Sequence, residues 1–295
     1  MKVVKKYNLR AILLLMLLPA FLISCGIREP KTDIVSVSIL PLQYFVDRLT
    51  GETLEVNVMV PEGASHGTYS PSARQMQKLS DSGLYFRFGY LGYEQAFIRR
   101  LSEINPELLE VDLSSKVELI RGEPIVHGDH VHEGGVDPHV WMSPKVMLSL
   151  LPEIRDALVE VYPEYQDEVD AAFPAIVEEV ELLHAEMLET TQNMLQKRFL
   201  IFHPALTYLA RDYGLEQVSI EHEGKEPSPA QLSHLISEAR AESIPVIFIQ
   251  EEYDQRNAEL VAAETGATIV RINPMAYDWM HEMNHLMEVL KQHFQ

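Results

Sequence analysis

The chain divides into two halves that repeat one pattern, separated by a single long amphipathic segment. Each half contains four short runs rich in β-branched and aromatic residues, with helical spacing between them. Strands that alternate with helices are typical of parallel sheets covered by helices on both faces. The pattern therefore predicts an α/β protein with two Rossmann-like lobes. The expected strands are 34–39, 56–60, 84–88 and 108–113 in the first half, then 199–202, 217–220, 246–249 and 268–272 in the second.

The segment between the two halves predicts one long helix. Its apolar residues recur at steps of three and four, which is the helical period; they are Val169, Phe173, Ile176, Val177, Val180, Leu183, Met187 and Leu188. Pro174 is expected to bend this helix or to mark an early turn, because proline lacks the backbone donor. We expect an N-terminal lobe over 34–163, a rigid linking helix over 164–196 and a C-terminal lobe over 197–295.

The N-terminus has the features of a secretory signal. A basic head is followed by an apolar run over 11–23, which is shorter than the roughly 20 residues that span a bilayer. The run ends at Leu22-Ile23-Ser24-Cys25, which resembles a bacterial lipobox, and that resemblance implies a lipidated Cys25. We therefore expect a signal peptide over 1–24, a lipidated tether over 25–33 and a membrane attachment through the lipid. Cys25 is the one cysteine, so disulfides and thiolate metal sites are excluded.

The net charge is strongly negative. It is −20 for the whole chain, and removal of the four cations of the signal peptide makes it −24. Such a charge argues against nucleic acid as a partner, because nucleic acids are bound through basic surfaces.

The chain has twelve histidines, and four of them lie between His127 and His139. His127, His130 and His132 stand among glycines, which predicts a flexible loop that collects metal weakly. A solvated polar loop without a metal function explains the same composition, and the two interpretations remain open.

Three other histidines are better candidates for a preorganised metal site. His66 and His203 each follow an expected strand at its carboxyl end, where sites form in open α/β sheets. His139 lies in the rigid context Asp137-Pro138-His139, where Asp137 could orient the ring. Imidazole nitrogens are ligands that zinc prefers. Together the three histidines predict a metal site that draws on both lobes.

The segment His281-Glu282-Met283-Asn284-His285 fits the helical metalloprotease motif His-Glu-x-x-His. Only ten residues follow it, which leaves almost no chain for a third ligand or a substrate cleft. Its apolar residues have the spacing of an ordinary amphipathic helix. We therefore expect a surface helix here and no protease.

Several motifs in this order resemble the metal-specific solute-binding proteins of ABC importers, the zinc and manganese family with a rigid helical linker. The motifs are Gly63-Ala64-Ser65 with Thr68-Tyr69, Asp137-Pro138-His139-Val140-Trp141, His203-Pro204-Ala205, Glu226-Pro227-Ser228-Pro229 and Asn273-Pro274-Met275. The resemblance implies a metal between two α/β lobes. It also implies a monomeric, extracytoplasmic, lipid-anchored zinc-binding protein that is not an enzyme and serves a membrane permease.

The resemblance carries three ligands onto His66, His139 and His203, with Zn²⁺ favoured over Mn²⁺ because the donors are imidazoles. The family's usual Ser-Pro-His-Thr-Tyr is Ser65-His66-Gly67-Thr68-Tyr69 here, so the first histidine is displaced by one position. The family's fourth ligand, a carboxylate, falls near Ala276, which cannot ligate. Asp278, Glu62 or a water are the substitutes. A zinc hydrolase, or a lipoprotein adhesin with incidental metal binding, are the alternative functions.

Overall fold

The computed structural model describes residues 32–96, 105–122, 125–127, 130–132, 135–221, 226–251, 253 and 255–294. The predicted signal peptide, the lipidation site Cys25 and almost all of the predicted tether lie outside these residues. Both predicted lobes belong to one compact unit, Asp33–Gln295. No helix within the described ranges is long and apolar enough to cross a membrane.

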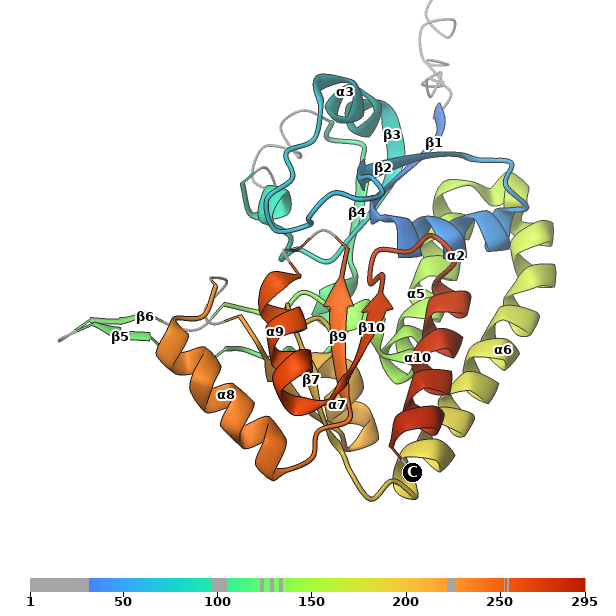
Figure 1. Cartoon of the computed structure of the whole chain (residues 1–295). Coiled ribbons are helices and arrows are strands. Elements are labelled where there is room, and N and C mark those ends of the chain that lie inside the picture. The colour runs from blue at the N-terminus through green and yellow to red at the C-terminus, as the bar shows by residue number, and fades with distance from the viewer. Residues whose placement is uncertain are drawn as a thin grey trace, which may run out of the picture. The chain divides into compact units, whose positions relative to one another are not determined.

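The N-terminal lobe is built on a four-stranded sheet with the order β2-β1-β3-β4 (Figure 1). The register between β1 and β2 and that between β3 and β4 are parallel. Helix α3 (Ala73–Asp81) begins with a capping box in which Ser72 and Gln75 satisfy each other's backbone donors. The strands are β1 (Thr32–Ile39), β2 (Glu55–Val60), β3 (Ser82–Arg87) and β4 (Leu109–Asp112).

The C-terminal lobe repeats this topology. Its four-stranded sheet has the order β10-β9-β7-β8, so the first strand again lies between the second and the third. Ligand sites of such sheets lie outside the carboxyl ends of the strands, at the point where the strand order reverses. The strands are β7 (Arg198–Ile201), β8 (Glu216–Ser219), β9 (Val246–Gln250) and β10 (Thr268–Ile272), and the helices between them are α7 (Thr207–Tyr213), α8 (Pro229–Ala241) and α9 (Arg256–Thr265).

One long helix, α6 (Gln166–Gln192), joins the two lobes, which confirms the two-lobe α/β prediction. It contains Pro174 near its start. Helix α6 packs against α2 (Leu40–Thr50) and α5 (Pro144–Val161) of the first lobe and against the C-terminal helix α10 (Trp279–His293). Figure 1 shows α6, α5 and α10 side by side along one flank of the molecule.

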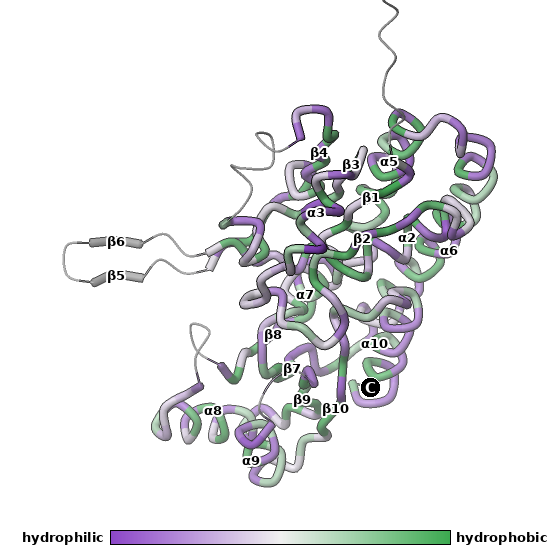
Figure 2. The backbone as a smooth tube through the Cα atoms, turned by 90° about the horizontal axis from the view of Figure 1, so that it is seen from above, coloured by the Kyte–Doolittle hydropathy of each residue, from purple (hydrophilic) through white to green (hydrophobic). Residues whose placement is uncertain are grey.

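The hydrophobic core has a large part that crosses from one lobe to the other. Strand β7 shows the division, because its alternate residues face opposite sides: Phe199 and Ile201 join the large cluster, whereas Leu200 joins a smaller one under α8 and α9. The hydropathy of α8 and α10 alternates along the helix, as expected when one face of each is buried (Figure 2).

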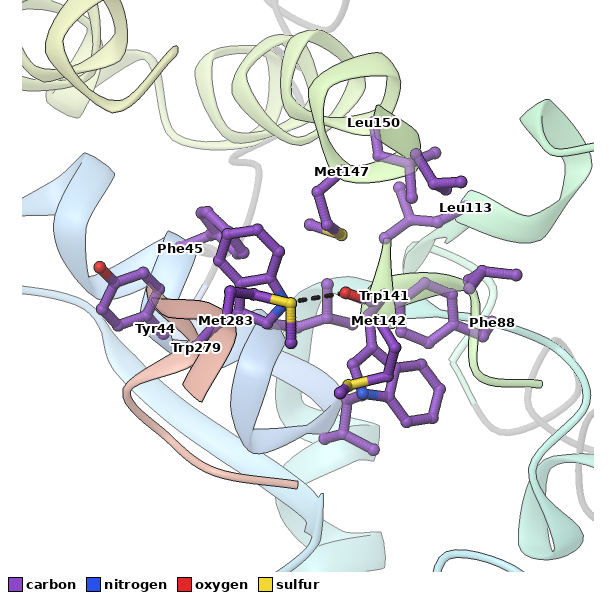
Figure 3. Packing of buried hydrophobic residues seen from close by; sticks show 14 of the residues in the cluster. Tyr44, Phe45, Phe88, Leu113, Trp141, Met142, Met147, Leu150, Trp279 and Met283 are labelled. Carbon is purple, nitrogen blue, oxygen red and sulfur yellow. Dashed lines mark hydrogen bonds between the residues drawn. The ribbon is translucent and has the colours of Figure 1, made fainter. Parts of the chain in front are cut away.

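Two tryptophans connect the lobes at the centre of the large cluster. The indole of Trp279 donates a hydrogen bond to the carbonyl of Trp141 over 2.8 Å (Figure 3), and the indole of Trp141 donates to the carbonyl of Pro274 over 2.7 Å. Both side chains are almost completely buried, and Phe45 packs against Trp279. The chain beside His139 is therefore held by the segment that leads into α10.

The segment predicted to be a flexible histidine loop differs from expectation. It forms a small antiparallel pair, β5 (Ile125–His127) with β6 (His130–His132), in which His127 and His130 are register partners. The β-branched residues that flank Gly128-Asp129 explain this pairing, because such a pattern favours a hairpin. Its role in collecting metal stays a prediction.

Candidate metal centre

Three histidines from distant parts of the sequence meet where the two lobes face each other. One ligand nitrogen from each of His66, His139 and His203 lies within 4.8 Å of the others. The ring centroids are 4.6 Å apart for His66 and His139, 5.7 Å for His66 and His203, and 5.3 Å for His139 and His203. Among the described residues, this is the one cluster of histidine and acidic side chains with metal-binding geometry.

His66 lies in the loop that follows β2 and reaches the cluster despite its displacement in the sequence. A turn in which the N–H groups of Thr68 and Tyr69 donate to the carbonyl of Ser65 brings it there. Its side chain is almost fully buried, and its Nδ1 is buried without a hydrogen-bond partner. Burial, followed by the neighbouring charges of His139 and His203, lowers the pKa of His66 to about 2. His66 is therefore neutral at physiological pH, as a metal ligand must be.

His139 is held rigidly by the turn that Asp137 begins. The carboxylate of Asp137 accepts from the backbone N–H of His139 over 2.9 Å and from its Nδ1 over 2.7 Å. Burial by itself raises the pKa of Asp137, but the charge and hydrogen bonds of His139 outweigh it and the net pKa is lowered. An ionised carboxylate only accepts, so the Nδ1 of His139 carries a proton and its Nε2 is the ring nitrogen that faces the cluster.

His203 follows β7 and has an equivalent arrangement in the other lobe. Its Nδ1 lies 2.9 Å from Oε1 of Glu221, and its ring stacks on Tyr253 with the centroids 4.8 Å apart. Gln250 contacts the backbone of His203 from β9 and accepts from its N–H. With its Nδ1 donating to Glu221, the buried Nε2 of His203 is left without a partner and can bind a metal.

The Nε2 atoms of His66 and His139 are only 2.9 Å apart, which is a hydrogen-bond distance. A hydrogen bond at this distance requires one of these two nitrogens to carry a proton. Three imidazoles in such proximity fit a late first-row divalent ion such as Zn²⁺.

The structure does not support Asp278 as the fourth ligand. Asp278 is the N-cap of α10, and its carboxylate accepts the backbone N–H of His281 over 3.0 Å. An acidic residue is favoured there because the N-terminus of a helix is electropositive. Glu62, the other candidate, lines a small cavity with Glu251 and Asn273, beside the loop that carries His66.

The sequence predictions named Asp137 as the partner of His139 but missed Glu221 and Tyr208, which support other parts of the centre. Glu221 follows the expected strand 217–220 at its carboxyl end, which was the available signal. Tyr208 donates from α7 to the backbone carbonyl of Asp137 over 2.8 Å, so the C-terminal lobe supports the turn that carries His139. No feature of the sequence pairs Tyr208 with Asp137, because their contact depends on how the lobes pack.

Comparisons with known proteins point to a family of zinc-uptake proteins. The family model described as "Zinc-uptake complex component A periplasmic" matches residues 35–293. The zinc-binding lipoprotein AdcA of Streptococcus pneumoniae is 28% identical over an alignment 284 residues long that covers 90% of this chain and 55% of AdcA. The chain thus spans about half the length of that relative.

Solved structures show the same fold. The crystal structure of ZnuA superposes with a TM-score of 0.79 at 30% identity and covers 89% of this chain and 99% of ZnuA. The laminin-binding protein Lmb of Streptococcus agalactiae, described as a bifunctional protein with adhesin and metal transporting activity, has a TM-score of 0.76 over 89% of this chain and 99% of its own. At 24% identity, the second likeness concerns the fold alone.

Proposed function

This chain belongs to the family of periplasmic zinc-uptake component A proteins, and we propose from that premise that it captures Zn²⁺ outside the cytoplasm for an ABC importer. The observation that carries the proposal is the convergence of three buried imidazoles from two lobes. Two of the three rings have a carboxylate on Nδ1 and direct Nε2 toward the cluster. Neutral imidazoles favour zinc over manganese, which prefers more oxygen ligands.

In this proposal His66 and His139 bind from the N-terminal lobe and His203 from the C-terminal lobe. The cation then connects the two lobes, and delivery to the membrane permease requires the permease to loosen that connection. Zinc sites commonly have four ligands. Asp278 is occupied as a helix cap, so Glu62 or a water is the better candidate for the fourth position.

The family serves transport by binding a solute, and we propose that this chain has no hydrolytic activity of its own. Glu282 of the His-Glu-x-x-His segment supports this view. Its buried carboxylate accepts the backbone N–H of Asn273 over 2.9 Å, so it is engaged in the fold and is not available as a general base.

Titration of the metal-free protein with zinc against a competing chelator tests the proposal. We expect one tight equivalent in the wild type, and its loss in His139→Ala and in His203→Ala because each removes one of three ligands. His234→Ala is the control, since the His234 side chain is 82% exposed and lies on α8. A double His139→Ala/His203→Ala variant that kept the tight equivalent would contradict the proposed site.

We also propose that the mature protein is a monomer attached to the membrane through lipid on Cys25. The lipobox-like sequence before Cys25 and the lipoprotein among the relatives support the attachment. Cys25→Ala should move the protein from the membrane fraction to the soluble extracytoplasmic fraction, as measured by fractionation and immunoblotting. If Cys25→Ala stays in the membrane fraction to the same extent as the wild type, the lipid attachment is refuted.

A further inference from the structure

His66 differs from the other two histidines in how it is held. Asp137 orients the ring of His139 and Glu221 orients that of His203, each through an Nδ1 hydrogen bond. The Nδ1 of His66 has no such partner among the described residues. The side chain of His66 therefore depends on the position of its backbone for its place in the cluster.

The backbone of His66 is contacted by the segment that follows β3. The N–H of Gly92 donates to the carbonyl of His66 over 3.2 Å. A Cβ on Gly92 would lie 2.2 Å from the carbonyl oxygen of Gly67, a distance that no side chain can occupy without moving the backbone. Glycine is thus required at position 92 by the close approach of the two loops.

A buried carboxylate holds this glycine in place. Glu94 is 1% exposed, and its two oxygens accept the backbone N–H groups of Phe88 over 3.3 Å and Leu91 over 3.0 Å. The hydroxyl of Ser38, at the end of β1, also donates to Glu94. These bonds fold residues 88–91 into a turn that leads into the helical residues 92–96. The ring of Phe88 packs 5.2 Å from that of Trp141 (Figure 3), which in turn lies beside His139.

We propose that Gly92 and Glu94 are positioning residues for the metal ligand His66. Glu94 sets the turn, Gly92 lets the turn approach the loop of His66, and the Gly92 hydrogen bond fixes the backbone from which the imidazole reaches the cluster. This inference rests on the proposed function, because it concerns the same metal centre. It explains how a histidine without an orienting partner of its own reaches the other two.

The variant Gly92→Ala tests the inference. We expect zinc affinity, measured by chelator competition, to fall by about tenfold or more, the size of effect seen when outer-shell partners of a metal site are lost. Cobalt(II) bound in place of zinc supplies a second readout, because its visible spectrum reports the ligand geometry. We expect the Gly92→Ala spectrum to change in band position or intensity.

A matched glycine variant separates positioning from general destabilisation. Gly83→Ala also crowds the N-terminal lobe, with its Cβ 3.0 Å from the hydroxyl of Tyr162 and 3.2 Å from Val161, but it lies at the amino end of β3, away from the cluster. We expect Gly83→Ala to lower the stability of the protein and to leave the zinc affinity and cobalt spectrum of the folded protein unchanged.

Glu94→Gln gives a second test that adds no atoms to the crowded loops. Its amide nitrogen would face a backbone N–H that now meets a carboxylate oxygen, so the turn should shift and zinc affinity should fall in the same direction. The inference is overturned if folded Gly92→Ala keeps the zinc affinity and the cobalt spectrum of the wild type. If Gly92→Ala does not fold, the same result in Glu94→Gln overturns it. These results differ from those that would contradict the proposed function. In that case the wild type itself would have no zinc site that depends on His139 and His203.

Discussion

At the scale of single residues, burial and the charges of the neighbouring histidines together set the pKa of His66. An imidazole that is almost fully buried beside two others loses the hydration that its protonated form needs. The pKa of His66 accordingly falls to about 2, from an ordinary value near 6.5. The unfolded chain therefore binds a proton below about pH 6.5 that the folded, metal-free chain does not bind.

The stability of the metal-free protein should consequently fall as the pH drops below about 6.5. A depressed folded-state pKa gives stability that is fully present above the unfolded pKa and is lost at lower pH, by about 1.4 kcal/mol per pH unit for one group. His66→Gln cannot be protonated, so its profile between pH 7.5 and 5 should be flatter by this amount. Urea unfolding at several pH values measures the difference.

The control for this experiment is His234→Gln, which alters an exposed histidine of the other lobe. Its stability should follow the wild-type profile at every pH. Parallel profiles for His66→Gln and the wild type would show that His66 titrates normally in the folded protein, contrary to the expectation.

At the scale of elements, α10 shows how a catalytic motif can arise from ordinary helix packing. Its buried face consists of apolar residues with Glu282 among them, and the faces that carry His281 and His285 are partly open to solvent. The Nε2 of His285 lies 3.1 Å from the backbone carbonyl of Arg271. Burial raises the pKa of Glu282, and its carboxylate is held by Asn273.

The double variant His281→Ala/His285→Ala should keep the tight zinc equivalent. We expect its free energy of unfolding to change by no more than about 1 kcal/mol, because one exposed hydrogen bond and two surface side chains are lost. Chelator competition and urea unfolding measure the two quantities. A folded variant, judged by circular dichroism, that has lost its zinc would favour the hydrolase alternative.

At the scale of the whole molecule, the lobes are joined by more than α6. The segment before α10 and the first residue of that helix are bound to the N-terminal lobe. Trp141 donates to Pro274 and accepts from Trp279, and the hydroxyl of Tyr277 donates to Asp47 of α2 over 2.9 Å. The larger hydrophobic cluster contains residues from both sheets. The two lobes should therefore unfold together.

Trp279→Ala should test this coupling. Removing a fully buried tryptophan costs about 3–5 kcal/mol, and the loss should lower the denaturation midpoint of the entire protein in a single transition. Far-UV circular dichroism and the fluorescence of the remaining Trp141 should report the same midpoint, as two-state unfolding requires. Two separate midpoints in the wild type would mean that the lobes are independent folding units.

Much of this architecture could be read from the sequence because it depends on local periodicity. Each of these elements has a pattern set by which side of that one segment is buried: the β-branched runs, the apolar spacing in 166–192 and the amphipathic pattern of α10. All eight expected strands are found within two residues of their predicted bounds. The sequence also pointed to one centre, because His66 and His203 each follow a strand and His139 lies beside Asp137.

What only the tertiary structure decided are the contacts between segments distant in sequence. Asp278 caps α10, Glu221 and Tyr208 support His203 and Asp137, and Gly92 contacts the loop of His66. The physical reason is that a carboxylate or a glycine has the same local pattern whether it faces solvent, a helix end or a buried imidazole. Its role is set by the groups that packing brings within about 3 Å of it, the range of a hydrogen bond.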